Sequence, residues 1–215
     1  KERFDRVIVD KFTDSRARHL KHLRRLVKRV RTLDQQADSK FAAWQRARGR
    51  RTAAFTSNIW LRPASGMGRD FEVYSNPRDR WEGNSAQVVT EEALDWVSTL
   101  PPEQPFFLWV HYLDPHWSYD PAPPYDTLYD PGFAAPWPYT SVVPGAGQGP
   151  IIFQNKMTQK EVAHAIALYE GEIAATDAQV GRLVDRLSGS GRLDHTLVVL
   201  TSDHGEQFGE HGLTG

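Results

Sequence analysis

Two short stretches of the sequence bring together side chains that could do chemistry. The first is HYLDPHWSYDPAPPY at residues 111–125, whose titratable groups besides tyrosine are His111, Asp114, His116 and Asp120. Pro115 stiffens the turn and helps to aim His116. Because histidine titrates near neutral pH, it suits general acid catalysis. The alternative is a proline-rich aromatic loop whose histidines only hydrogen-bond the backbone.

The second stretch, TSDHGEQFGEHG at residues 201–212, places a carboxylate beside an imidazole. Asp203 offers a hard oxygen and His204 a neutral nitrogen, and both suit a divalent cation. Gly205 and Gly209 let the backbone turn tightly near a bound ion or oxyanion. The alternative is that Asp203 caps a following helix while His204 faces solvent. A metal site and a capped helix are both open at this point.

Each stretch follows an apolar segment that has the character of a buried strand. These segments are FFLWVH at residues 106–111 and TLVVLT at residues 196–201, and TAAFTSN at 52–58 predicts a further short strand. In open parallel sheets, ligands bind beyond the carboxyl ends of the strands. We therefore expect both stretches at one edge of a sheet, with His116 within reach of the Asp203–His204 pair.

Amphipathic helices are predicted before both apolar segments. EEALDWVSTL at residues 91–100 has Thr90 as a candidate N-cap and is stopped by Pro101-Pro102. A longer helix starts at the capping box of Thr158 and Glu161 and ends in the Ser-Gly repeat at 188–191. Its expected buried face is Val162, Ile166, Tyr169, Ile173, Val180, Leu183, Val184 and Leu187. The alternation of strands and helices predicts an α/β fold with a mostly parallel sheet.

The charge is distributed unevenly along the 215 residues. Residues 1–51 carry 17 lysines and arginines against 6 acidic residues, whereas the rest carries 9 against 21. Within the basic part, RHLKHLRRLVKRVRTL at 18–33 predicts a poorly packed helix with a narrow apolar stripe of Leu20, Leu23, Val27 and Val30. Such a helix could bind nucleic acid or another polyanion, but no base-reading motif or interleaved aromatic residues accompany it. A solvated basic face is the simpler interpretation, and nucleic acid is not favoured as a partner.

Composition excludes several kinds of protein. A hydrophobic content of 40% supports a real core, and no apolar run is long enough to cross a bilayer. The absence of cysteine excludes disulfides, thiolate metal sites and a cysteine nucleophile within this sequence.

Three segments in order carry a resemblance to a known family. TSDHGEQFGEHGLTG resembles the metal-binding segment of the sulfatases of the alkaline phosphatase superfamily. FFLWVHYLDPHWSYDPAPPY resembles the strand and loop that cross the same site, and GRRTAAFTSNIWL at 49–61 is similar to a further segment of that family. The resemblance divides the chain into a basic, atypical segment at 1–40 and a partial sulfatase-type catalytic domain at 41–215. It implies an incomplete alkaline phosphatase-like three-layer sandwich.

The resemblance also implies roles for individual residues. Asp203 and His204 would be ligands of a divalent metal, usually calcium, with manganese or magnesium as alternatives. His116 would contact the sulfate and protonate the leaving oxygen, and His211 would be a further substrate-binding residue. The chemistry is consistent, because a cation stabilises the non-bridging oxygens of an ester and an acid assists departure of the alkoxide. The expected substrate is a sulfated small molecule or glycan.

Two family features are missing from the sequence. There is no Cys/Ser-x-Pro-x-Arg motif, whose first residue becomes the formylglycine nucleophile, and no paired aspartates near the N-terminus. Either the chain is a fragment of a longer sulfatase, or residues 1–40 are a diverged replacement. We expect the parent protein to be a metal-dependent sulfuric ester hydrolase and this chain alone to be inactive. The alternatives are a phosphonate or phosphate monoester hydrolase of the same superfamily and a non-catalytic relative that binds polyanions. Family members are often periplasmic or extracellular; localisation and oligomeric state stay open.

Overall fold

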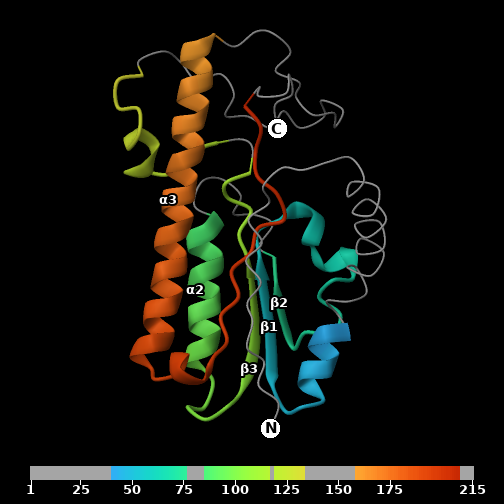
Figure 1. Ribbon diagram of the computed structural model, residues 1–215. Coiled ribbons are helices and arrows are strands. Elements are labelled where there is room, and N and C mark those ends of the chain that lie inside the picture. Colours follow the sequence, from blue (N-terminus) through green and yellow to red (C-terminus); the bar gives the residue numbers. More distant parts are fainter. Residues whose placement is uncertain (1–39, 77–84, 117–118, 134–157, 209–215) are drawn as a thin grey trace, which may run out of the picture.

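The computed structural model describes residues 40–76, 85–116, 119–133 and 158–208 (Figure 1). The predictions for the basic segment 1–40, including the helix at 18–33, lie outside these residues except for Lys40. His211 also lies outside them. The boundary between the segments 1–40 and 41–215 therefore stays a prediction.

The described strands form one parallel sheet with the order β2-β1-β3. The central strand β1 (Arg51–Thr56) pairs with β2 (Val73–Ser75) on one side and with β3 (Phe106–His111) on the other. The β1–β3 register runs from Arg51 opposite Phe106 to Thr56 opposite His111, so both strands end together. The prediction of strands in the segments 52–58 and 106–111, parallel to each other, is confirmed.

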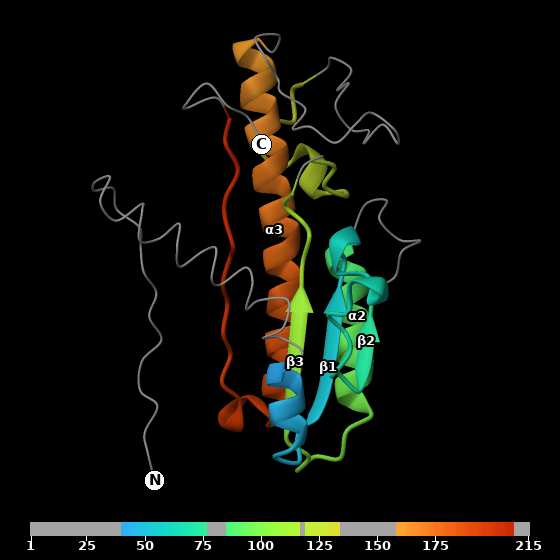
Figure 2. The ribbon, with the colours of Figure 1, turned by 90° about the vertical axis from the view of Figure 1, so that its right-hand side faces the viewer.

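Helices cover the two faces of this sheet and make three layers (Figures 1 and 2). Helix α2 (Ser85–Ser98) and helix α3 (Gln159–Gly189) lie on one face, where Phe55 packs in a cluster with Val89 and Trp96. The short helical segment 40–46 lies on the other face, where Ala42 packs near Ala54. Because successive side chains of β1 point to opposite faces, one strand serves both cores. The predicted three-layer α/β architecture is confirmed.

Helix α2 begins earlier than its capping signal predicted. It starts at Ser85, so Thr90 lies inside the helix, is fully buried, and forms a hydrogen bond of 2.9 Å with the Tyr112 hydroxyl. The interpretation of Thr90 as the N-cap was therefore wrong. Ala86 and Val89 are buried in the added turns, and this burial extends the helix past the local signal.

Helix α3 begins as predicted, and the face that it buries matches the expected one only in part: Leu187 is buried, and Leu183 and Tyr169 pack against the core clusters. Thr158 and Glu161 form the reciprocal capping box, and the helix ends at Gly189. However, Ile173 is exposed, and the buried residues are His164, Ala165, Leu168, Gly171, Glu172 and Leu187. The buried face includes two polar side chains because α3 packs against residues 119–133, which supply polar partners.

The segment 196–201 does not form the buried strand that its apolar sequence predicted. It follows a short 3-10 helix, η4 (Leu193–His195), and Figure 2 shows it running apart from the sheet, on the β3 side. Leu197, Val199 and Leu200 are 78%, 69% and 77% exposed. A strand needs a neighbour for its backbone hydrogen bonds, and the described strands supply none here.

None of the described helices has the combination of length and apolar character that a membrane span requires.

Candidate active site

The exits of β1 and β3 are tied together at the carboxyl edge of the sheet. Ser57 follows β1, and its hydroxyl accepts a hydrogen bond of 2.8 Å from the Leu113 backbone N–H. The same hydroxyl donates to the His111 carbonyl at 3.4 Å, and the Ser57 N–H reaches that carbonyl at 3.3 Å. These bonds fix the start of the loop that carries His116.

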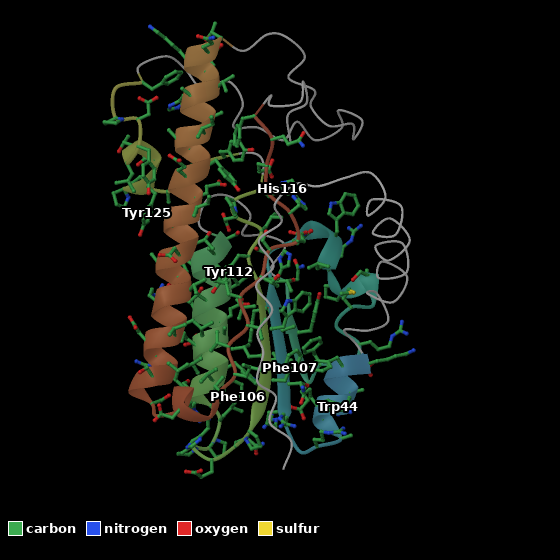
Figure 3. All side chains as sticks on the ribbon, in the orientation of Figure 1. Trp44, Phe106, Phe107, Tyr112, His116 and Tyr125 are labelled. Atoms are coloured by element: carbon green, nitrogen blue, oxygen red, sulfur yellow. The ribbon has the colours of Figure 1, made fainter. Side chains whose placement is uncertain are left out.

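The turn that bears His116 is also attached to helix α2. The Asp114 carboxylate accepts a hydrogen bond from the Ser85 hydroxyl, at the first residue of α2. The His116 N–H donates to the Leu113 carbonyl at 2.8 Å, which closes the turn. The His116 residue is exposed and lies beyond the carboxyl end of β3, far from Phe106 at the strand's start (Figure 3). The sequence therefore places a solvent-accessible imidazole where parallel sheets bind ligands.

His111, the last residue of β3, lies below this turn. Burial lowers the pKa of His111, although the Asp203 carboxylate acts in the opposite direction. The ring is therefore neutral at pH 7, and its Nδ1 atom is buried with no hydrogen-bond partner among the described residues. Sequence reasoning had placed His111 in the first stretch without giving it a role.

The side-chain donor atoms of Asp203 and His204, the predicted metal ligands, lie close together. His204 Nδ1 lies 2.9 Å from the Gly205 carbonyl, and in the tautomer that donates this hydrogen bond Nε2 keeps its lone pair. Nε2 is 3.7 Å from Asp203 Oδ2. A divalent ion held at about 2.0 to 2.4 Å from each atom fits between them. The side chains are 86% and 62% exposed for Asp203 and His204, respectively, so both are open to an ion from solvent.

Asp203 does not cap a helix in the described residues, contrary to the alternative interpretation. Residues 203–208 are not helical, and Asp203 Oδ1 instead accepts the His204 N–H at 3.1 Å. Within the described residues, no group of three histidine, aspartate or glutamate side chains is close enough to hold a metal. The pair thus offers two of the six or more ligand positions that calcium takes.

The two chemical stretches meet through aromatic and acidic side chains that sequence reasoning did not single out. The Tyr119 hydroxyl donates to the Glu206 carboxylate at 3.0 Å, and the Tyr119 ring lies 5.6 Å from that of Phe208. Tyr169 of α3 packs on both rings. Burial, followed by the charge of Glu206, raises the pKa of Tyr119 far above its ordinary value. Both stretches therefore contact each other, while the reach of His116 to Asp203 and His204 stays a prediction.

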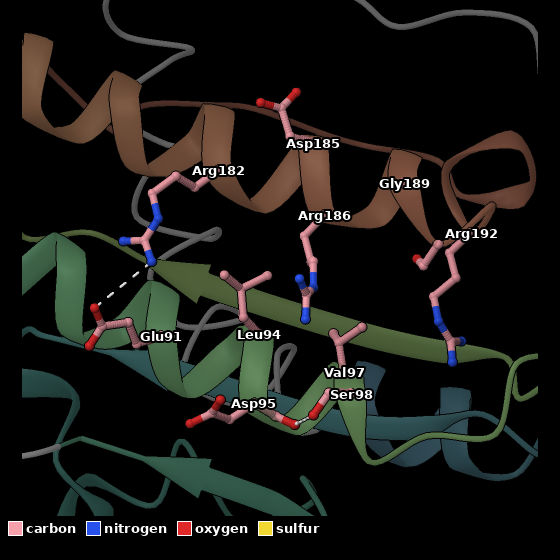
Figure 4. A pocket seen from close by; sticks show the side chains of 11 residues that line it. Glu91, Leu94, Asp95, Val97, Ser98, Arg182, Asp185, Arg186, Gly189 and Arg192 are labelled. Carbon is pink, nitrogen blue, oxygen red and sulfur yellow. Dashed lines mark hydrogen bonds and ion pairs between the residues drawn. The ribbon is translucent and has the colours of Figure 1, made fainter.

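A groove lies away from this site. It has a volume of about 1040 Å³ and runs between α2 and α3, lined by residues such as Leu94, Arg186 and Arg192 (Figure 4). Arg182 and Glu91 form an ion pair of 3.9 Å across it. The groove is near the C-terminal ends of both helices, whereas the Ser85 end of α2 faces the site. It is a helix–helix boundary, and none of the predicted site residues lines it.

The chain is similar to several known proteins. The family described as Sulfatase matches residues 21–215. An arylsulfatase of Clostridium perfringens is 30% identical over 128 residues, which are 57% of this chain and 27% of that protein. The multifunctional alkaline phosphatase superfamily protein PehA of Trinickia caryophylli is 30% identical over 62% of this chain and 30% of its own length.

The matched proteins are much longer than this chain. An arylsulfatase of Klebsiella aerogenes is 28% identical over 64% of the chain, and the match spans 33% of that relative. The chain therefore spans about a third or less of the length of these relatives. Among solved structures, a phosphonate monoester hydrolase of Agrobacterium radiobacter gives a TM-score of 0.47 and 24% identity, over 60% of this chain and 29% of that one. With the family match extending over residues 21–215, the chain belongs to the sulfatase family, in the alkaline phosphatase superfamily.

Proposed function

We propose that this chain is part of a metal-dependent sulfuric ester hydrolase. The observation that carries the proposal is the Asp203–His204 pair, whose donor atoms fit a shared cation and whose segment contacts the loop of His116. The sulfatase family match over 21–215 and the arylsulfatase relatives support the same function. The substrate class is a sulfated small molecule or glycan.

The residues of this chain divide the work at the ester. Asp203 and His204 would hold a divalent cation, which when bound supplies positive charge to the non-bridging oxygens of the ester. His116 contacts the sulfate and donates a proton to the leaving oxygen as the sulfur–oxygen bond breaks, which avoids expulsion of a bare alkoxide. His211 is proposed as a further contact with the substrate. Calcium is the first choice for the cation, with manganese and magnesium as alternatives.

The nucleophile is not supplied by this sequence. It has no cysteine and no Ser-x-Pro-x-Arg motif, so a formylglycine nucleophile would come from another part of a longer protein. Loss of a nucleophile lowers turnover by up to about a millionfold even when the rest of a site is intact. We therefore propose that the 215 residues alone do not hydrolyse sulfate esters at an enzymatic rate.

A second candidate is a phosphonate or phosphate monoester hydrolase of the same superfamily. The observation that favours it is His204, because imidazole suits transition-metal ions such as iron or zinc better than it suits calcium. A polyanion-binding role for the basic segment 18–33 would be a third, non-catalytic function. Salt-dependent binding of heparin by a peptide of residues 1–40 would test it.

The full-length gene product, assayed on chromogenic aryl sulfate, aryl phosphate and aryl phosphonate esters, separates these functions. We expect the highest kcat/KM on the sulfate, a loss on treatment with a chelator, and recovery with calcium. The variants Asp203→Asn and His116→Ala should each lower turnover strongly, whereas His195→Ala, at the opposite end of the sheet, should not. Preference for the phosphate or phosphonate ester would replace the first proposal by the second. Equal activity of Asp203→Asn and the wild type would contradict both. Fractionation of the producing cells would test the family-based expectation of export.

A further inference from the structure

A glutamate is buried in the middle of helix α3, with no positively charged partner in the part of the chain that the structure describes. Glu172 is 5% exposed, and no lysine, arginine or histidine among the described residues forms an ion pair with it. Burial of an unpaired charge is costly, so a buried glutamate is expected to be neutral or to have a specific role. Neither the ester chemistry nor the metal site described above uses this side chain.

Glu172 is bonded to the loop that follows His116. Its Oε1 atom accepts a hydrogen bond of 2.8 Å from the Asp120 backbone N–H. Its Oε2 atom is buried with no partner among the described residues. Glu172 lines a small cavity of about 100 Å³, together with Asp114 and Asp120. One carboxyl group thus connects the middle of α3 to a residue four positions after His116.

Gly171, the residue before Glu172, lets the same loop approach the backbone of α3. A Cβ atom on Gly171 would lie 2.5 Å from the Tyr125 carbonyl oxygen and 3.1 Å from Pro121 Cγ. No side chain fits there without displacing backbone, so glycine is required by close approach and not by its conformational freedom. On the preceding turn, Leu168 belongs to the same buried cluster as Tyr119.

We propose that Gly171 and Glu172 form a docking site on α3 for residues 119–125, and that Glu172 is the positioning residue for the loop of His116. The docking itself stands on the contacts above. Only its catalytic consequence rests on the proposed function, through the role of His116.

Glu172 performs this task in its neutral form. Burial, opposed by the hydrogen bond from Asp120 and reinforced by the carboxylates of Asp114, Asp120 and Glu206, raises the pKa of Glu172 to about 9. Tyr119 and Tyr169 are further titratable residues on this side, and Tyr125 also lines the cavity. Gln87 and Gln179 are the neutral polar residues that line it from α2 and α3. A protonated carboxyl keeps one oxygen as the acceptor for Asp120 and leaves the other as a donor toward the cavity.

The raised pKa predicts how stability depends on pH. In the unfolded chain Glu172 loses its proton near pH 4.5, whereas in the folded chain it keeps the proton until about pH 9. The unfolded state binds fewer protons in that interval, so the folded state loses stability as the pH rises from 4.5 to 9. When the folded state binds one proton more than the unfolded state, the unfolding constant increases by up to about tenfold for each pH unit that the pH rises.

The test compares Glu172→Gln and Glu172→Leu in this chain. The glutamine keeps the shape and the acceptor for Asp120 but does not titrate. Between pH 5 and 8, we expect the unfolding constant of the wild type to rise more steeply with pH than that of Glu172→Gln. The difference between the two slopes should be up to about tenfold per pH unit. We expect the Asp120 amide to exchange its hydrogen about five- to tenfold faster in Glu172→Leu and at the wild-type rate in Glu172→Gln. If the unfolding constants of the wild type and Glu172→Gln depend on pH in the same way, the proposal that Glu172 is neutral in the folded state is wrong. This outcome does not depend on whether the leucine variant folds. If the Asp120 amide hydrogen exchanges as slowly in a folded Glu172→Leu protein as in the wild type, the proposed docking contact is wrong.

Activity of the full-length protein tests the consequence for His116. A mispositioned acid slows substrates with poor leaving groups more than substrates with good ones, since only the former need the proton. Glu172→Leu should therefore lower kcat more on an alkyl sulfate than on an activated aryl sulfate, and Glu172→Gln should restore kcat on both. An equal loss on both esters would overturn the positioning role. Absence of sulfatase activity in the wild type would contradict the proposed function, while the exchange and pH measurements would still decide the docking.

Discussion

Strand β1 and the segment 196–201 each contain a short run of apolar residues, yet only β1 is part of the sheet. Strand β1 has a parallel neighbour on each side and a helical layer on each face, and Ala53, Ala54 and Phe55 are almost completely buried. The segment 196–201 pairs with none of the described strands, and its leucines and valines are exposed. An apolar run therefore specifies a strand only when the fold supplies a partner for its backbone.

The same contrast applies to the two chemical stretches. The loop of His116 is fixed by Ser57, which follows β1, by Ser85 of α2 and by Glu172 of α3. The Asp203–His204 pair lies on the less supported segment and is followed by an anchor at Glu206 and Phe208. The chain thus positions its proposed acid more firmly than its proposed metal ligands.

The largest expected effect comes from the same substitution in the packed and the exposed region. Leu187→Ala removes a leucine that is 4% exposed in the core beneath β1, and we expect a loss of about 2 to 5 kcal/mol in the free energy of unfolding. Leu200→Ala, at a leucine that is 77% exposed, should change it by less than about 0.5 kcal/mol. Urea unfolding monitored by circular dichroism measures both. A loss above about 2 kcal/mol in Leu200→Ala would mean that the segment 196–201 is packed as a strand after all.

A smaller effect is expected where α3 meets the loop of His116. In Gly171→Ala the new methyl group meets the Tyr125 carbonyl, and we expect a destabilisation of about 1 to 3 kcal/mol. Gly181→Ala is the matched control, because a Cβ atom there has no atom within 4 Å. It should stabilise the helix by about 0.5 to 1 kcal/mol through better helix propensity. Equal stabilisation by both substitutions in thermal unfolding would show that the loop does not pack closely on α3.

The smallest effect is expected at the groove between α2 and α3. Glu91→Gln removes the charge from the 3.9 Å ion pair with Arg182, whose two side chains are each about half exposed. Such exposed pairs contribute little, so the change should be within about 0.5 kcal/mol and should shrink further in high salt. A loss of several kcal/mol would show that this groove is closed and structurally important.

The parts of the fold that local rules determine could be predicted from the sequence. The strands at 52–58 and 106–111, their parallel direction, and the capping box and end of α3 all follow from periodicity, turn chemistry and capping. The three-layer architecture followed from the alternation of elements and from the family resemblance. Thr90 was misinterpreted because burial of Ala86 and Val89 overrides a good capping signal.

The features that sequence reasoning missed depend on tertiary contacts. Periodicity assigned a purely apolar face to α3, so Glu172 and His164 were not expected to be buried. His164 is accommodated by a 2.9 Å contact between its Nδ1 and the Asp130 carboxylate. The contact of Tyr119 with Glu206 joins residues 87 positions apart. A glycine directly before a glutamate in a helix interior was the one local signal of close approach on α3.

The central claim is that Asp203 and His204 bind a divalent cation at an edge of the sheet that they share with His116. Titration of the 215-residue chain with Mn²⁺, followed by the imidazole proton signals in NMR, tests it most directly, because the paramagnetic ion broadens nearby signals. The account predicts that His204 broadens first and His111 and His116 next, while His195, the last residue of η4 at the opposite end of the sheet, stays sharp. Asp203→Asn should shift this pattern to much higher Mn²⁺ concentrations. Broadening of His204 without His116, or equal broadening of His195, would contradict a shared metal site at this edge.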